Sequence, residues 1–77
     1  MTEIEFCEKY CGELTKEQIG MINYNIKMKK FLGVGRQYAG SYSKLFPMVI
    51  IGKTVNIINK AGYYDFCATD NRIAYKP

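Results

Sequence analysis

The fold class is decided by residues 45–59, whose sequence is LFPMVIIGKTVNIIN. Leu45–Ile51 is a continuous apolar run of strand length, and Gly52-Lys53 behind it is typical of a turn or a bulge. Pro47 is compatible with a strand because it stands near the start of the run. Thr54–Asn59 alternates imperfectly and is rich in β-branched residues, which favours a second strand. These residues predict neighbouring strands of an antiparallel sheet.

The chain on either side of this pair extends the β part. Ala61-Gly62 is a break, Tyr63–Thr69 favours a further strand, and Asp70-Asn71 is typical of a two-residue hairpin turn before Arg72–Lys76. On the N-terminal side, Gly33–Lys44 is interpreted as a loop or an irregular edge strand. We therefore expect residues 34–77 to form an antiparallel sheet of three to five strands, with a small SH3-like barrel as the alternative.

Residues 2–33 are expected to form two helices. Thr2 with Glu5, and Thr15 with Gln18, have the spacing of a capping box, in which each residue satisfies the free backbone N–H of the other. The second helix is expected to run for about four turns and to stop at Gly33, where glycine favours the left-handed conformation. The sequence thus predicts a single α+β domain over residues 1–77, with two N-terminal helices followed by the sheet.

The second predicted helix is apolar on two sides. One side carries Ile19, Ile22 and Ile26, and the roughly opposite side carries Met21, Tyr24, Met28 and Leu32, with Phe31 beside them. Such a helix is either sandwiched between the first helix and the sheet, or it presents one side to a partner or to a second copy in a homodimer. Because methionine suits adaptable contacts, the candidate association face consists of Met21, Tyr24, Met28 and Phe31.

Charge is segregated along the chain, which carries 11 basic and 7 acidic residues and a formal net charge of +4. The first 17 residues hold five glutamates against two lysines, a net −3, and the remainder holds nine basic residues against two aspartates, a net +7. A basic body attracts anionic partners such as nucleic acid. Acids near a helix start and solubilising lysines produce the same pattern. The modest total and the presence of only two arginines favour this second interpretation.

Basic residues interleaved with tyrosine are the feature most indicative of binding. One such group follows the second predicted helix and consists of Arg36, Tyr38, Tyr42 and Lys44. Aromatic faces stack on unpaired bases while cations hold the backbone, and tyrosine and arginine also dominate protein–protein hot spots. Tyrosines packed in a sheet core with lysines at its rim would give the same pattern. We expect protein contact rather than nucleic acid, with these four residues binding the partner.

Residues for catalysis and metal binding are scarce. The chain has no histidine, the side chain that most readily transfers protons near neutral pH. Cys7, Cys11 and Cys67 are too few for a closed four-ligand zinc site and are interpreted as buried apolar residues. Gly35 and Gly40 have the glycine spacing of a phosphate loop, but Ser41-Tyr42 follows where the loop requires a lysine. We therefore expect no enzyme activity, no cofactor and no metal.

The remaining features concern location and source. The longest apolar run is far shorter than the ~20 residues that cross a bilayer, and the acidic start is unlike a signal peptide, so a cytoplasmic protein of a bacterial cell is expected. The dominant residue types have A/T-rich codons, which indicates a low-GC bacterium, its phage or a mobile element. The sequence predicts a small non-enzymatic phage or mobile-element protein that inhibits or modulates a host protein by occluding its surface. The alternative is a small basic nucleic-acid-binding regulator.

Overall fold

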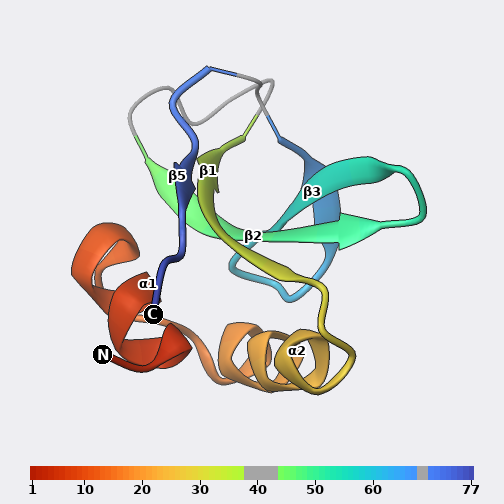
Figure 1. The fold of residues 1–77 in the computed structure, drawn as a ribbon. Helices are drawn as coiled ribbons and strands as arrows, with labels where there is room; N and C mark the ends of the chain where they lie inside the picture. Colours follow the sequence, from red (N-terminus) through yellow and green to blue (C-terminus); the bar gives the residue numbers. More distant parts are fainter. Residues whose placement is uncertain (38–43, 68–69) are drawn as a thin grey trace.

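The computed structural model describes residues 1–37, 44–67 and 70–77. Two helices are followed by five strands that form one antiparallel sheet in the order β4-β3-β2-β1-β5 (Figure 1). The elements are α1 (Glu3–Cys11), α2 (Lys16–Lys27), β1 (Phe31–Arg36), β2 (Leu45–Ile51), β3 (Thr54–Ile58), β4 (Tyr64–Phe66) and β5 (Ile73–Ala74). The predicted α+β class, with two N-terminal helices before an antiparallel sheet, is confirmed.

Both helices begin as the sequence predicts. The Thr2 hydroxyl accepts a hydrogen bond from the Glu5 N–H at 3.1 Å, and the Glu5 carboxylate accepts one from the Thr2 N–H at 2.7 Å. Thr15 and Gln18 form the same reciprocal pair at 3.1 and 3.0 Å. Each capping box thus satisfies backbone donors that the first helical turn leaves unpaired.

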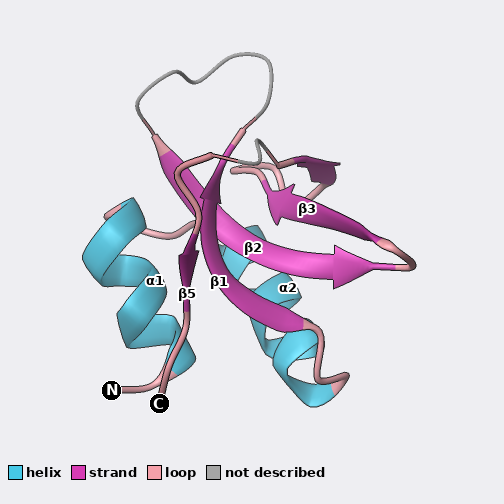
Figure 2. Cartoon of the chain, turned by 45° about the horizontal axis from the view of Figure 1, so that its top comes forward, coloured by secondary structure: helices cyan, strands magenta, loops and turns pink. Residues whose placement is uncertain are grey.

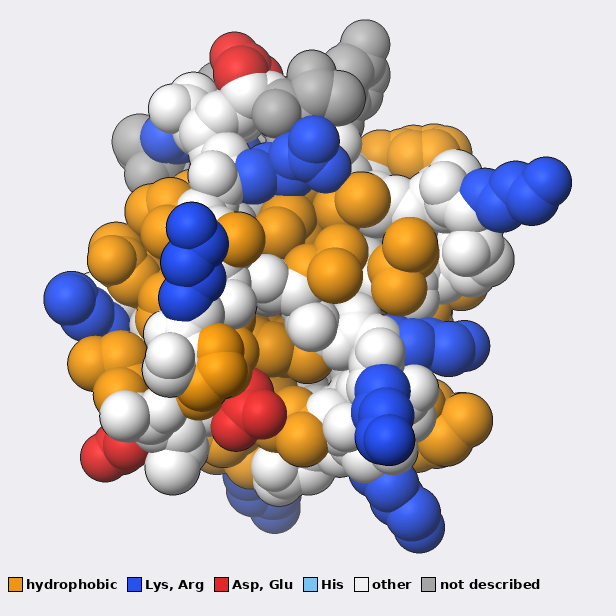
Figure 3. Space-filling view, in the orientation of Figure 1, with side chains coloured by type: hydrophobic (Ala, Val, Ile, Leu, Met, Phe, Trp, Pro, Cys, Tyr) orange, Lys and Arg blue, Asp and Glu red, His pale blue; other side chains and the backbone are white. Residues whose placement is uncertain are grey.

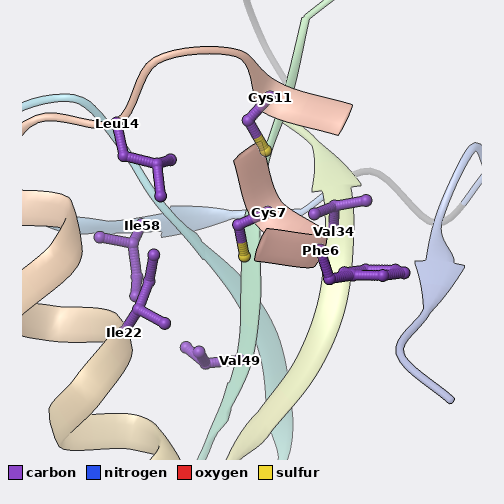
Figure 4. Close-up of a cluster of buried hydrophobic side chains, with 8 residues drawn as sticks. All are labelled: Phe6, Cys7, Cys11, Leu14, Ile22, Val34, Val49 and Ile58. Carbon is purple, nitrogen blue, oxygen red and sulfur yellow. The ribbon is translucent and has the colours of Figure 1, made fainter. Parts of the chain in front are cut away.

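The core lies between the two helices and one face of the sheet. Both helices contact β1 and β2, and α2 also contacts β3; Figure 2 shows α2 behind β1 and β2, with α1 beside β5. The buried apolar side chains between them point toward one another (Figure 4) and are Phe6, Cys7, Cys11, Leu14, Ile22, Val34, Val49 and Ile58. The interpretation of Cys7 and Cys11 as buried apolar residues is therefore confirmed, and both thiols are free.

Helix α2 ends six residues before the predicted stop at Gly33, so the predicted helical span of residues 2–33 is too long. Lys27 is the last helical residue, and Lys29, not Gly33, adopts the left-handed conformation, with φ 61°. Phe31 already belongs to β1, which therefore starts before the predicted β part of residues 34–77. Because β1 pairs with β2 on one side and β5 on the other, nonlocal strand pairing outweighs the helical pattern at Phe31 and Leu32.

The prediction of a loop or irregular edge strand for Gly33–Lys44 is wrong for its first residues, because Gly33–Arg36 belongs to β1, an interior strand; residues 38–43 of that prediction lie outside the described residues. Gly33 has φ 146° and lies at an irregularity in the β1–β2 register. A Cβ atom at Gly33 would meet the Ile73 carbonyl oxygen and would lie 2.8 Å from the Tyr75 nitrogen. The absence of a side chain here is what allows β5 to approach β1.

The predicted hairpin between the last two strands does not form. Asn71 has the left-handed φ of 69° that suits a turn, but β4 and β5 lie at opposite edges of the sheet. β5 pairs with β1 instead, and the Tyr75 N–H continues this pairing by donating to the Leu32 carbonyl at 2.9 Å. The Tyr75 hydroxyl then donates to the Met1 carbonyl at 2.7 Å, which brings the two ends of the chain together beside α1 (Figure 1).

The alternative of a small barrel is wrong as well, because the sheet is not closed. β4 and β5 remain its two edges. An isolated bridge between Gln37 and Cys67 links the end of β1 to the end of β4. The sheet is therefore curved enough for these two strand ends to meet, while most of β4 pairs only with β3 among the described residues.

We predict opposite effects for alanine at two glycines. Gly33→Ala should destabilise the fold by more than about 1 kcal/mol, because the new methyl group meets the β5 backbone at a φ that alanine rarely adopts. Gly20→Ala should stabilise it by about 0.5–1 kcal/mol, because Gly20 lies within α2 with nothing within 4 Å of the added carbon. Urea unfolding measures both values, and a Gly33→Ala protein as stable as the wild type would contradict this account of the β1–β5 contact.

Candidate functional site

The structure describes only part of the predicted partner-binding group. Arg36 is the last residue of β1 and Lys44 directly precedes β2, and both are half-buried. Tyr38 and Tyr42 lie outside the described residues. The Lys44 and Lys60 side chains lie together, and their hydrogen bond, in which one nitrogen must be a neutral amine to accept, lowers the pKa of Lys44, as does the like charge of Lys60. Positive charge is thus concentrated locally between the segment before β2 and the turn after β3.

The predicted association face is divided between the surface and the core. Tyr24 and Met28 are 53% and 45% exposed. Met21 and Phe31 pack against the core cluster, and Phe31 lies in β1 rather than on the helix. The placement of Phe31 on a helical face is therefore wrong, because α2 ends before it. Only Tyr24 and Met28 remain as an exposed apolar pair, one helical turn apart at the C-terminal end of α2.

A second set of exposed aromatic side chains belongs to β4 and the turn before it. Tyr63, Tyr64 and Phe66 are 72%, 37% and 68% exposed. Tyr64 pairs with Ile58 and Phe66 with Asn56 across the β3–β4 ladder. Because Ile58 belongs to the core cluster, Tyr64 and Phe66 project on the side of the sheet that carries the helices.

Asn25 joins this aromatic strand to α2. Its amide nitrogen donates to the Met21 carbonyl at 2.8 Å and to the Tyr64 hydroxyl at 3.4 Å. Asn25 is fully buried, and its Oδ1 atom has no hydrogen-bond partner among the described residues. This one side-chain hydrogen bond links α2 to β4, and we name the exposed residues of the two elements, Tyr24, Met28, Tyr64 and Phe66, the α2–β4 patch.

A polar network fixes the other side of β4. The Asp65 carboxylate accepts hydrogen bonds from the Asn59 side chain at 2.7 Å and from the Gln37 side chain at 3.2 Å. The Asn59 side-chain oxygen accepts two further bonds, from the backbone N–H groups of Ala61 and Tyr63, each at 3.0 Å. The network links the end of β1 to β4 and fixes the turn before β4. The backbone of the β4 residues in the patch is therefore held in place.

The three cysteine thiols have raised pKa values. Burial raises the pKa of the Cys7 thiol and raises that of Cys11 to about 12. Burial also raises the pKa of the half-buried Cys67, although the charge of Arg72 opposes the shift. All three are therefore protonated thiols at neutral pH rather than nucleophilic thiolates. Among the described residues there is no group of three or more side chains that could hold a metal ion.

On the face shown in Figure 3, several lysine and arginine side chains lie near one another at the lower right and others stand apart, with hydrophobic side chains between them. No helix within the described part of the chain is long and apolar enough to span a membrane.

Comparisons of the chain with protein-family models, with curated proteins and with solved structures found no match.

Sequence reasoning identified Tyr24 and Met28 but missed the contribution of β4. The alternation of Tyr64, Asp65 and Phe66 predicted a strand, and the aromatic residues on either side of the aspartate were the available signal. Their place in the patch depends on β4 being an edge strand linked to α2 through Asn25, and strand order follows from nonlocal pairing rather than from local pattern.

We expect Asn59→Ala to destabilise the protein by about 1–3 kcal/mol, because it removes a bond to a carboxylate and two bonds to the turn backbone. Asn56→Ala is the matched control. Among the described residues the side chain of half-buried Asn56 bonds only to Thr54 within its own strand, so this variant should change the unfolding free energy by less than about 0.5 kcal/mol. Equal losses in urea unfolding would show that the Asp65 network does not hold the turn.

We also expect a stability loss at alkaline pH that depends on the buried thiols. Cys11 has a pKa of about 12 in the folded protein and an ordinary value near 9 when unfolded, so unfolded chains ionise first. Its contribution is fully present below the unfolded value and is lost as the pH rises toward the folded one. The unfolding free energy of wild-type protein should fall more steeply above about pH 9 than that of Cys11→Ser. Identical slopes of unfolding free energy against pH for the two proteins would contradict this role of the Cys11 thiol.

Proposed function

We propose that this chain is a small non-enzymatic binding protein that covers a surface of another protein with the α2–β4 patch. One observation carries the proposal: Tyr24, Met28 and Phe66 are about half or more exposed although each has a large apolar side chain. Exposed apolar residues grouped on adjoining elements are typical of interaction sites, because their transfer from water drives association.

The chemistry of the patch supports protein contact. Tyrosine supplies a large apolar ring and one hydroxyl and is enriched among residues that dominate binding energy. Methionine adapts its shape to irregular surfaces. Tyr64 adds no formal charge to the surface. Its hydroxyl already accepts a hydrogen bond from the Asn25 amide group at 3.4 Å. The Tyr64 side chain therefore has less freedom to lose on binding, which reduces its part of the entropic cost of association.

The mode of action that fits this scaffold is occlusion. Covering a functional surface requires a rigid support and a complementary face, and it requires no reacting group. In this proposal the chain is encoded by a phage or a mobile element and inhibits or modulates a protein of its bacterial host. The A/T-rich coding bias of its residue types supports that source.

One observation favours the alternative of a nucleic-acid-binding regulator. Lys44 and Lys60 lie close enough for their charges to interact, and Lys44 adjoins the segment that contains Tyr38 and Tyr42. Binding of this kind would weaken steeply with salt, because neutralised phosphates release their counterions. The hydrophobic side chains exposed among the basic ones on the face shown in Figure 3 support protein contact instead.

The test compares affinity capture by three immobilised forms of the protein from bacterial lysate. Wild type and Lys53→Ser, a control in the exposed β2–β3 turn, should each retain the same protein in near-stoichiometric amount. The double variant Tyr24→Ser, Met28→Ser should retain at least about tenfold less of that protein, because truncating two patch residues removes about 1.4 kcal/mol or more of binding free energy. Circular dichroism checks that all three are folded.

Two outcomes would contradict the proposal. One is the absence of any stoichiometric protein with wild type, and the other is capture that the double variant leaves unchanged. A mobility shift of single-stranded DNA at low ionic strength that disappears with added salt would favour the nucleic-acid alternative.

A further inference from the structure

We propose that Lys44 and Lys60 together form a binding site for a phosphate monoester, a group that carries nearly two negative charges at neutral pH. This inference goes beyond the proposed function, because it assigns a second site with a different ligand chemistry. Lys44 directly precedes β2 and Lys60 lies in the turn after β3, so the site is at one end of the β2–β3 pair.

The pairing of β2 with β3 brings the two lysines together. Met48 of β2 pairs with Ile57 of β3, and the two strands run antiparallel. The same register, continued beyond β2 to Lys44, would set that residue opposite Ala61, which follows Lys60 in the chain. The side chains of Lys44 and Lys60 share a hydrogen bond. Two long basic side chains from separate segments thus end at the same place.

The backbone that carries Lys60 is held in position. The Thr15 hydroxyl donates to the Lys60 carbonyl at 2.8 Å, and the Gly62 N–H donates to the Asn59 carbonyl at 2.9 Å. Gly62 also lies against Glu17, because a Cβ atom on the glycine would be 2.9 Å from the Glu17 Cβ. Thr15 is the N-cap of α2. The turn is therefore fixed on the start of this helix, whose dipole adds positive potential beside Lys60.

The lysine pair has no acidic partner among the described residues, which include all seven acidic residues of the chain. The groups that act on the charge of Lys44 are Lys60 and the buried Cys11 thiol of α1, and Glu17 is not among them. The hydrogen bond to Lys60 and its like charge lower the pKa of Lys44, because the amine that accepts the bond must be neutral. An anion between the two nitrogen atoms would allow both to be charged.

The class of ligand follows from the number of charges. A carboxylate or a phosphodiester carries one negative charge, whereas a phosphate monoester carries nearly two and presents three acceptor oxygens. Two ammonium groups, with three N–H donors each, can neutralise the monoester and bond to several of its oxygens. Such charge-assisted bonds are about twice as strong as neutral ones. Lys60 is exposed and Lys44 is half-buried, so the pair can be reached from solvent.

The probe is methyl phosphate, titrated into the full wild-type chain at low ionic strength and followed by NMR. The backbone amide signals of residues 44 and 60 should shift saturably, with a dissociation constant in about the millimolar range. The signal of Lys53, in the exposed turn at the other end of the β2–β3 pair, should not shift. Dimethyl phosphate has a single charge and should bind at least about tenfold more weakly.

The protonation of Lys44 gives a readout that general screening would not move. Its pKa, followed through the Cε signal, should rise in saturating methyl phosphate, because the bound dianion stabilises the charged form of the amine. The same signal of Lys53 reports the effect of added salt alone. Both measurements use wild-type protein, so they do not depend on the folding of any variant.

Substitutions locate the site on the lysine pair. The double variant Lys44→Gln, Lys60→Gln should bind methyl phosphate at least about tenfold more weakly than wild type, because it removes both charge-assisted bonds. Lys53→Gln is the matched control, since it removes an equal charge from an exposed turn, and it should bind as wild type does. Circular dichroism verifies that both variants are folded.

Treatment of the lysate with phosphatase distinguishes two sources of the monoester. If the treatment and the double lysine variant each abolish capture of the retained protein, the phosphate belongs to a phosphorylated protein. If neither changes capture, it belongs to a small phosphorylated compound. Each result supports the site once the titration has shown binding.

Five results would overturn the site. They are no saturable shift at residues 44 and 60, an equal shift at Lys53, equal affinities for methyl and dimethyl phosphate, an unchanged Lys44 pKa, or an unchanged affinity of the double lysine variant. Equal affinities would assign the pair to phosphodiesters and favour the nucleic-acid alternative. Because neither lysine belongs to the α2–β4 patch, loss of this site would leave the proposed function to its own test with Tyr24 and Met28.

Discussion

Everything in this structure depends on the burial of one sheet face under two short helices. Ile22 of α2 and Cys7 of α1 are completely buried against Val49 and Ile58 of the sheet. This interface holds eight of the eleven buried hydrophobic side chains of the described residues, and their removal from water stabilises the fold. Once the isoleucine side of α2 faces the sheet, helical geometry directs Tyr24 toward solvent. The exposed patch is thus a geometric consequence of the core.

Features fixed by residues close in sequence could be predicted, and features fixed by distant contacts could not. Both helix starts follow from Thr2 and Thr15, whose partners lie three residues away. The span of β2 follows from its own apolar run. The end of α2 and the partner of β5 depend on the approach of β5 to Gly33. That contact joins residues about 40 positions apart in the chain, and no local pattern specifies it.

The same division applies to the candidate site. Tyr24 and Met28 could be identified from helical periodicity alone. Their neighbour Tyr64 is brought to them by Asn25, a contact across 39 positions that requires the complete sheet. Asn25 also keeps an oxygen atom buried without a partner among the described residues, an arrangement that costs free energy. The side chain that bears this cost is the one that bonds to the Tyr64 hydroxyl.

The bond between the Tyr75 hydroxyl and the Met1 carbonyl has a practical consequence. This bond holds Met1 against Tyr75, so both ends of the chain lie beside α1 (Figure 1). A tether attached to either end would therefore extend from the same place on the surface. Immobilisation through the amino or the carboxyl end would therefore orient the molecule alike. A short peptide linker could also join the two ends, and new termini opened in the β2–β3 turn would give a circularly permuted chain with the same core.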